Sequence, residues 1–168
     1  MFNGIIKKTG KIKQIYKSNK SYFIEILSDV KFSKNEIGTS VSCSGACLTL
    51  EKVSGNLNRF FLSYETINKT NFKTAKKDDV INIEKSLKYG DRISGHFVQG
   101  HIDTTSRIKK INIVGNSWFI NFKLSKKYKK YLLKYPITFS KVKQAPEHAT
   151  DSPISFLKNL TSDRISIK

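Results

Sequence analysis

The stretch "GIIKKTGKIKQI" (Gly4–Ile15) occurs again in altered form as "GHIDTTSRIKKI" (Gly100–Ile111), at an offset of 96 residues (100 minus 4). A second pair, "SYFIEI" (Ser21–Ile26) and "SWFINF" (Ser117–Phe122), keeps the same offset of 96 (117 minus 21). Because both matches share one spacing, no gap is needed between them. This constancy indicates an internal repeat.

Both copies of the repeat have the pattern of β-strands. "KIKQIY" and "RIKKINIV" alternate apolar and polar residues, and "SYFIEIL" and "SWFINFKL" are rich in aromatic and β-branched residues. In the first copy we expect further strands over 39–53, 59–64 and 80–84, a turn at 54–56 and a short helical turn after Glu65. About six short strands within ~85 residues predict a small closed barrel, because closure removes exposed strand edges.

The repeat predicts two domains, an N-terminal barrel over 1–86 and a C-terminal barrel over 96–168. The polar stretch "KSLKYGDRISG" (Lys85–Gly95) forms the boundary between them. The second copy diverges after about residue 134, where no counterpart of "SVSCSGACLTL" follows and Pro146 and Pro153 interrupt strand pairing. Either the second barrel is abbreviated, or this end of the sequence is not native to the fold.

The charge of the chain is strongly positive, with a formal net charge of +18. A basic surface attracts nucleic acids without regard to their sequence. Arginine, which supplies the bidentate contacts typical of nucleic-acid sites, occurs only at 59, 92, 107 and 164, and lysine makes up the rest. The composition therefore favours a solvated lysine surface, and no nucleic-acid partner is expected.

The short apolar runs and the small number of cysteines and histidines predict a cytoplasmic protein without a metal site. No stretch approaches the ~20 apolar residues of a membrane span, so we expect no membrane partner. In a reducing cytosol Cys43 and Cys47 are not expected to form a disulfide. A zinc site is not expected either, because only His96, His101 and His148 accompany these two cysteines.

Several blocks of the sequence resemble one known family, the riboflavin synthase α-chain family. These blocks are "MFNGII", "GTSVSCSGACLTL", "SYETINKTN", "VINIE" and "GDRISGHFVQGHID", in this order, and the resemblance as a whole covers Met1 to about Leu133. The pair formed by "SGACLTL" and "GHFVQGHID" is the most specific part of the resemblance. It implies an all-β fold of two tandem six-stranded antiparallel Greek-key barrels, of which the second is incomplete in this chain.

The resemblance also implies a transferase reaction that needs no metal and no redox cofactor. Two molecules of 6,7-dimethyl-8-ribityllumazine react, one donating a four-carbon unit to the other, to give riboflavin and a ribityl diaminopyrimidine. Members of the family are homotrimers, and association with lumazine synthase is a further expected partnership. Their active site forms between the N-terminal barrel of one subunit and the C-terminal barrel of a neighbour.

The site residues implied by the resemblance match the chemistry, which requires a base and a nucleophile or an activated water. Cys47 is the candidate nucleophile or polar positioner, His101 the candidate acid or base, and Ser40 completes the catalytic set. Gly100, His101 and Ile102 are expected to face the first barrel of the next subunit. The expected substrate-binding residues are Phe2, Gly4, Ile5, Ile6, Ser42, Cys47, Leu48, Thr49, Phe61, Leu62, Ser63, Tyr64, Glu65, Thr66, Gly100, His101 and Ile102.

Several of these residues also have a purely structural interpretation. A lone cysteine in a strand is usually a small core residue, and this interpretation is retained for Cys43. Phe2 equally well fills one end of a barrel, and the alternative for Ser40 and Ser42 is that they are ordinary exposed strand residues. His101 is different, because it occupies the position that Ile5 has in the first copy, and a titratable group in place of an apolar one favours function.

Two other functions remain open from the sequence. Lumazine-carrying fluorescent proteins resemble the same double barrel without catalysing a reaction, and the family's second "DG-SLT"-like block is missing after Leu133. A single-strand nucleic-acid binder on a small barrel is the other alternative, and it would need aromatic stacking platforms beside basic residues.

Overall fold

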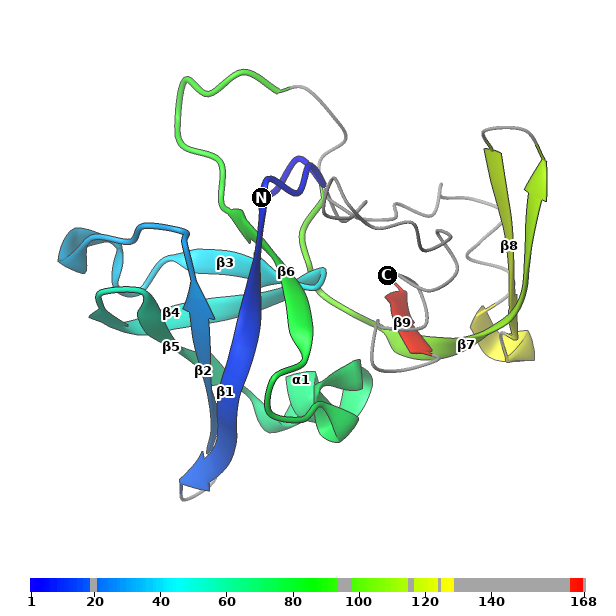
Figure 1. Ribbon diagram of the computed structural model, residues 1–168, viewed down its shortest axis with the longest axis horizontal. Helices are drawn as coiled ribbons and strands as arrows, with labels where there is room; N and C mark the ends of the chain where they lie inside the picture. The colour runs from blue at the N-terminus through cyan, green and yellow to red at the C-terminus, as the bar shows by residue number, and fades with distance from the viewer. Residues whose placement is uncertain (19–20, 94–97, 115–116, 124, 129–163, 168) are drawn as a thin grey trace.

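The computed structural model describes most of the chain, and strands dominate it (Figure 1). One closed six-stranded antiparallel barrel is accompanied by a separate three-stranded sheet, which confirms the predicted all-β class with a partial second sheet. The described residues are 1–18, 21–93, 98–114, 117–123, 125–128 and 164–167.

The barrel has the strand order β1-β2-β5-β4-β3-β6, and β6 pairs with β1 to close it. The strands β3, β4 and β5 follow one another as hairpins, and β5 lies beside β2, which is the Greek-key connection. The strand bounds are β1 Lys8–Ser18, β2 Ser21–Ser28, β3 Ser40–Cys43, β4 Ala46–Ser54, β5 Leu57–Leu62 and β6 Val80–Lys85.

Short helices and tight turns connect these strands. The turn between β3 and β4 has positive φ at both central residues, Ser44 (φ 47) and Gly45 (φ 87), as a two-residue hairpin requires. The strand predicted over 59–64 ends at Leu62, because Ser63 leaves the sheet to cap a helix. The helices are η1 Lys34–Glu36, α1 Tyr64–Lys69 and η2 Asn71–Thr74.

The barrel interior holds the hydrophobic core. Alternate residues of each strand point inward, and those of β5, such as Phe60 and Leu62, are fully buried. Gly10 also faces this interior, where an added Cβ would lie 2.6 Å from Ile26 Cγ2 and 2.7 Å from Ile83 Cδ1. The core therefore leaves no room for a side chain at this position of β1.

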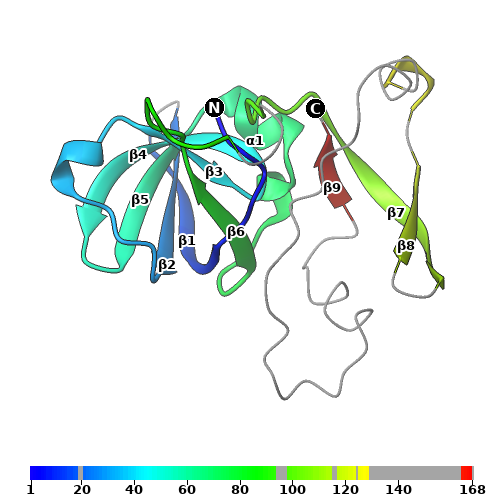
Figure 2. The ribbon, with the colours of Figure 1, turned by 90° about the horizontal axis from the view of Figure 1, so that it is seen from above.

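The second sheet has the order β8-β7-β9 and repeats the geometry of the first hairpin. Its strands are β7 Thr104–Val114, β8 Ser117–Lys123 and β9 Arg164–Ile167. The register shift between Ile12 and Gln14 of β1 recurs between Ile108 and Lys110 of β7, at the offset of 96 (108 minus 12). Figures 1 and 2 show β9 beside β7, on the side nearer the barrel.

The two units meet near the N-terminus. The Phe2 and Val98 backbones exchange two hydrogen bonds, of 2.8 and 2.9 Å. Because these residues are equivalent positions of the two copies (98 minus 2 is 96) and pair antiparallel, they lie on a local two-fold axis. The Glu84 carboxylate accepts hydrogen bonds from the backbone N–H groups of Asn3 (2.6 Å) and Gly4 (3.2 Å), which holds the N-terminal segment against β6.

Across the described part of the chain, none of the helices is both long and apolar enough to cross a membrane.

Candidate functional site

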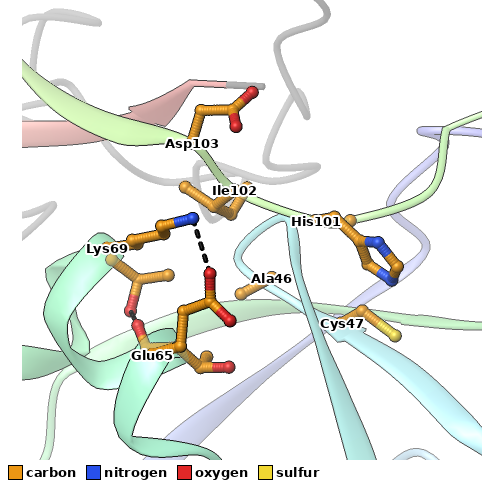
Figure 3. Close-up of a pocket in the computed structure, with 10 residues that line it drawn as sticks. Ala46, Cys47, Glu65, Lys69, His101, Ile102 and Asp103 are labelled. Atoms are coloured by element: carbon orange, nitrogen blue, oxygen red, sulfur yellow. Dashed lines mark hydrogen bonds and ion pairs between the residues drawn. The ribbon is translucent and has the colours of Figure 1, made fainter.

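A cleft of about 320 Å³ opens where the first unit meets the segment that leads into β7. Three parts of the chain form its walls: the start of β4, the helix α1 with the residue after it, and the segment 100–103 (Figure 3). The lining residues are Ala46, Cys47, Glu65, Thr66, Lys69, Thr70, Gly100, His101, Ile102 and Asp103.

Gly100 fixes the segment to the barrel. Its carbonyl accepts a hydrogen bond of 2.8 Å from the Cys47 N–H. The φ of Gly100 is +77°, and a Cβ there would lie 2.9 Å from the Cys47 nitrogen, so only glycine allows this approach. Gly100, His101 and Ile102 thus lie against the first barrel of their own chain, whereas the expected neighbour was the barrel of the next subunit.

The two cysteines have different environments, as expected. Cys43 ends β3 inside the core and is fully buried, and burial, followed by the nearby Cys47, raises the pKa of its thiol. Cys47 pairs with Ser42 across the hairpin and is only partly buried. Its side chain therefore lies on the outer face of the barrel, at the cleft.

His101 is exposed and lies next to Cys47. Figure 3 shows the imidazole and the Cys47 side chain pointing to the same side of the cleft, with the ion pair of α1 on the other side. The backbone hydrogen bond from Cys47 to Gly100 sets this adjacency. The arrangement puts a titratable nitrogen and a thiol side by side at one end of the cleft.

The helix α1 supplies the opposite wall. The Ser63 hydroxyl caps it by accepting a hydrogen bond of 3.0 Å from the Thr66 N–H and lies 2.9 Å from the Thr66 hydroxyl. Glu65 and Lys69, one helical turn apart, form an ion pair of 2.6 Å. The hydrogen bond from Lys69 is the first cause of a Glu65 pKa below its usual value.

Four residues that line the cleft were missed by the sequence analysis. They are Ala46, Lys69, Thr70 and Asp103. Lys69 and Thr70 follow Glu65 and Thr66 at the i, i+4 spacing of a helix, so the expectation of a helical turn after Glu65 contained this signal. Asp103 directly follows the predicted residues 100–102.

A second group of predicted residues lies on the outer face of the barrel, outside the cleft. Thr49 is the cross-strand neighbour of both Ser40 and Phe61, and Phe61 pairs in turn with Phe23. The Phe23 and Phe61 rings make an edge contact with centroids 6.1 Å apart. Ser40, Thr49 and Phe61 therefore form one row across the strands rather than part of the cleft wall.

The remaining predicted residues are dispersed. Leu48 and Leu62 point into the core, and Phe2 and Ile6 are buried as well. Tyr64 is 64% exposed on α1. Ile5 lines a separate, wider hollow of about 980 Å³, together with Ser40 and Glu84. His96 and His148, for which no function was expected, lie outside the described residues.

The chemistry available in the cleft is that of an acid or base, a thiol and hydroxyl groups. The described residues contain no group of three or more His, Cys, Asp or Glu side chains that could hold a metal ion. The Cys47 thiol and the His101 imidazole, which both line the cleft, are suited to nucleophilic addition and proton transfer.

Comparison with known proteins relates the barrel to one family. The model of the family described as the lumazine binding domain matches residues 3–86, which is 84 of 168 residues. The chain is 37% identical over 135 residues to riboflavin synthase of Escherichia coli (strain K12), which covers 79% of this chain and 63% of that protein. It is 32% identical over 133 residues to riboflavin synthase of Actinobacillus pleuropneumoniae, covering 79% and 62%.

A solved structure agrees with the observed architecture. LumP complexed with riboflavin aligns with a TM-score of 0.62 at 24% sequence identity, covering 77% of this chain and 71% of that chain. At this identity the likeness concerns the fold. The chain spans 62–63% of the length of the two riboflavin synthases.

Proposed function

The chain belongs to the lumazine-binding family, and from this premise we propose that it is a riboflavin synthase acting on 6,7-dimethyl-8-ribityllumazine. The proposed reaction transfers a four-carbon unit between two lumazine molecules and yields riboflavin and a ribityl diaminopyrimidine. The relatives that carry this name are 32% and 37% identical to the chain, which supports a transferase-type activity.

One observation carries the proposal: a single cleft unites six of the residues expected in the site, which are Cys47, Glu65, Thr66, Gly100, His101 and Ile102. Cys47 and His101 lie at one end of it, and Glu65 and Thr66 lie on the opposite wall. The cleft volume of about 320 Å³ is at the lower end of the ~300–1,000 Å³ range of small-molecule sites.

In the proposed mechanism each group has one role. The His101 imidazole takes a proton from the 7-methyl group of one lumazine and returns it later as an acid. The Cys47 thiol adds to the ring or positions it. The Thr66 hydroxyl and the Glu65 carboxylate hydrogen-bond the ribityl hydroxyls. Lys69 holds Glu65 in place through their ion pair.

The second lumazine molecule needs a second half-site, and we propose that a neighbouring subunit of a homotrimer supplies it. The reaction joins two identical substrates, so two half-sites must face each other. Light scattering with and without lumazine measures the mass in solution. A trimer is the expected result, and a monomer in both conditions would contradict this part of the proposal.

A second candidate function is non-catalytic binding of a lumazine or a flavin. It is favoured by the contrast between six paired strands in the first unit and three in the described part of the second. A chain with one complete half-site would hold a ligand without converting it.

Incubation with 6,7-dimethyl-8-ribityllumazine tests both functions. We expect riboflavin to appear in the visible absorbance spectrum, and His101→Gln to slow its formation by about 10²-fold or more. The Cys47→Ser variant tests the thiol, and Cys43→Ala is the matched control that leaves the cleft unchanged. Binding without any riboflavin formation would overturn the synthase and support the binding function.

A further inference from the structure

The last described strand, β9, has the same place in the second unit that β6 has in the first. We propose that β9 is the counterpart of the closing strand β6, and that it acts as a positioning element for the His101 wall of the cleft. The second half of this proposal rests on the proposed function, because the cleft is the proposed lumazine site.

The register of β9 on β7 reproduces that of β6 on β1. In the first unit Lys8, the first residue of β1, pairs with Ile83, and the ladder runs antiparallel to Lys11 and Val80. In the second unit Thr104, the first residue of β7, pairs with Ile167, and the ladder runs to Arg107 and Arg164. Each ladder has four pairs and starts at equivalent residues of β1 and β7 (104 minus 8 is 96).

The sequences of the two strands agree with this correspondence. "VINI" (Val80–Ile83) and "RISI" (Arg164–Ile167) share isoleucine at their second and fourth positions and a small polar residue between them, and each follows an aspartate. Their offset is 84 residues (164 minus 80), which is 12 fewer than the offset of 96. A comparison of the sequence with itself at one constant spacing therefore does not detect this match.

The position of β9 gives it a role at the cleft. The strand β8 pairs with β7 only from Arg107 onward. Among the strands that the structure describes, β9 is therefore the one that pairs with Thr104, Thr105 and Ser106. These residues follow directly on His101, Ile102 and Asp103, so the ladder with β9 anchors the C-terminal side of that cleft wall.

β9 also lies next to the first unit. It is in contact with η2, the helix that follows α1, and Figure 2 shows it between the barrel and β7. The strand thus links the segment behind one cleft wall to the helical region that forms the other. Loss of β9 should free the start of β7 and let His101 move relative to Cys47, and small displacements of reacting groups reduce binding and rate strongly.

The experiment uses the full chain with Ile165→Pro and Ser166→Pro combined, because proline cannot donate to the ladder. The matched control combines Ile165→Val and Ile167→Val, which keeps the strand. Amide hydrogen exchange of Thr104–Ser106 should accelerate by about tenfold or more in the proline variant, while the barrel amides stay protected. The lumazine dissociation constant, measured by fluorescence titration, should rise by about tenfold.

The two measurements test the two parts of the proposal separately: the assignment of β9 as a closing strand and its positioning role. Unchanged exchange at Thr104–Ser106 would overturn the strand assignment. Accelerated exchange with an unchanged dissociation constant would overturn the positioning role. If the unaltered chain does not bind lumazine, the proposed function fails, and the exchange measurement still decides whether β9 closes the second unit.

Discussion

The hairpins β1–β2 and β7–β8 have the same register and the same bulge but different surroundings. In β1, Ile12 is fully buried in a closed barrel, whereas its counterpart in β7, Ile108, is only partly buried. At the next inward position, Gly10 has no room for a side chain, whereas Ser106 has a hydroxyl that donates to the Lys123 carbonyl at 2.7 Å. Local sequence is therefore sufficient for the hairpin, while the partners that close the sheet determine what each position tolerates.

The largest effect on stability is expected from truncating Ile12 and its equivalent in the second copy, Ile108. Ile12→Ala should lower the free energy of unfolding by about 2–5 kcal/mol, because it opens a cavity in the closed core. Ile108→Ala should cost about 1 kcal/mol, because its side chain is already partly exposed. Denaturation followed by circular dichroism measures the unfolding free energy of both variants. The fluorescence of the single tryptophan, Trp118 in β8, follows unfolding of the second sheet separately. Equal costs would contradict the contrast between the two units.

A smaller effect on stability is expected from swapping the residues at the next inward position, which is Gly10 in β1 and Ser106 in β7. Gly10→Ser should cost about 1–3 kcal/mol, because its Cβ would crowd Ile26 and Ile83. Ser106→Gly is the reciprocal variant and should cost about 1 kcal/mol, because it removes one hydrogen bond and raises the conformational entropy of the unfolded chain. If Gly10→Ser is neutral in urea denaturation, the interior of the first barrel is less tightly packed than the distances indicate.

The joint between the two units can be broken at Gly100. Gly100→Ala places a Cβ at 2.9 Å from the Cys47 nitrogen and strains a φ of +77°, at an expected cost of about 1–3 kcal/mol. The barrel should keep its own stability, while lumazine affinity, measured by titration, falls with the loss of the Cys47 hydrogen bond. Gly90→Ala is the control, since it carries the same backbone strain (φ +87°) with nothing within 4 Å of its Cβ. Equal loss of affinity in both variants would show that strain alone explains the effect.

The smallest effect is expected at Glu84, which secures the N-terminal segment against β6 of the first unit. Burial is the first cause of a raised Glu84 pKa, opposed by the hydrogen bonds from Asn3 and Gly4. A raised carboxyl pKa means that the folded state holds its proton more tightly, so this contribution to stability is present at low pH. It is lost as the pH rises from about 4.3, the ordinary glutamate value, through the raised value.

Glu84→Gln should therefore flatten the dependence of the unfolding free energy on pH in that window, because the amide keeps an acceptor without the titration. Denaturation at a series of pH values provides the measurement. Glu25→Gln, at a partly buried position of β2, is the control. A pH profile that stays the same in Glu84→Gln would contradict the role assigned to burial.

Much of the fold could be predicted because hairpins are local. The alternation in "KIKQIY" and "RIKKINIV" placed β1 and β7, and the repeat offset of 96 holds for their bulges too. The turn at 54–56 and the closing strand near Val80 are confirmed. The strand predicted over 59–64 lies two residues earlier, at Leu57–Leu62, because a helix cap at Ser63 competes with strand continuation and alternation does not reveal it.

The candidate site was predicted less completely, because it depends on contacts between distant segments. The resemblance pointed to Cys47 and His101, but not to the backbone bond by which Gly100 joins them within one chain. Leu48 and Leu62 were predicted to bind the substrate because they stand in the matched motifs. Both alternate with outward-pointing residues along their strands, and this alternation places their side chains in the core. The strand β9 was missed because its distance from β7 is not fixed by the repeat.

The tether between Glu84 and the first residues of the chain has a consequence for synthesis on the ribosome. Asn3 and Glu84 are 81 residues apart, so the segment around Asn3 cannot reach this carboxylate until most of the barrel has been translated. At about 5–20 residues per second this delay is several seconds, longer than a hairpin needs to form. The segment around Asn3 should therefore dock onto a barrel whose other strands have already been made, and the partner backbone at Val98 arrives later still.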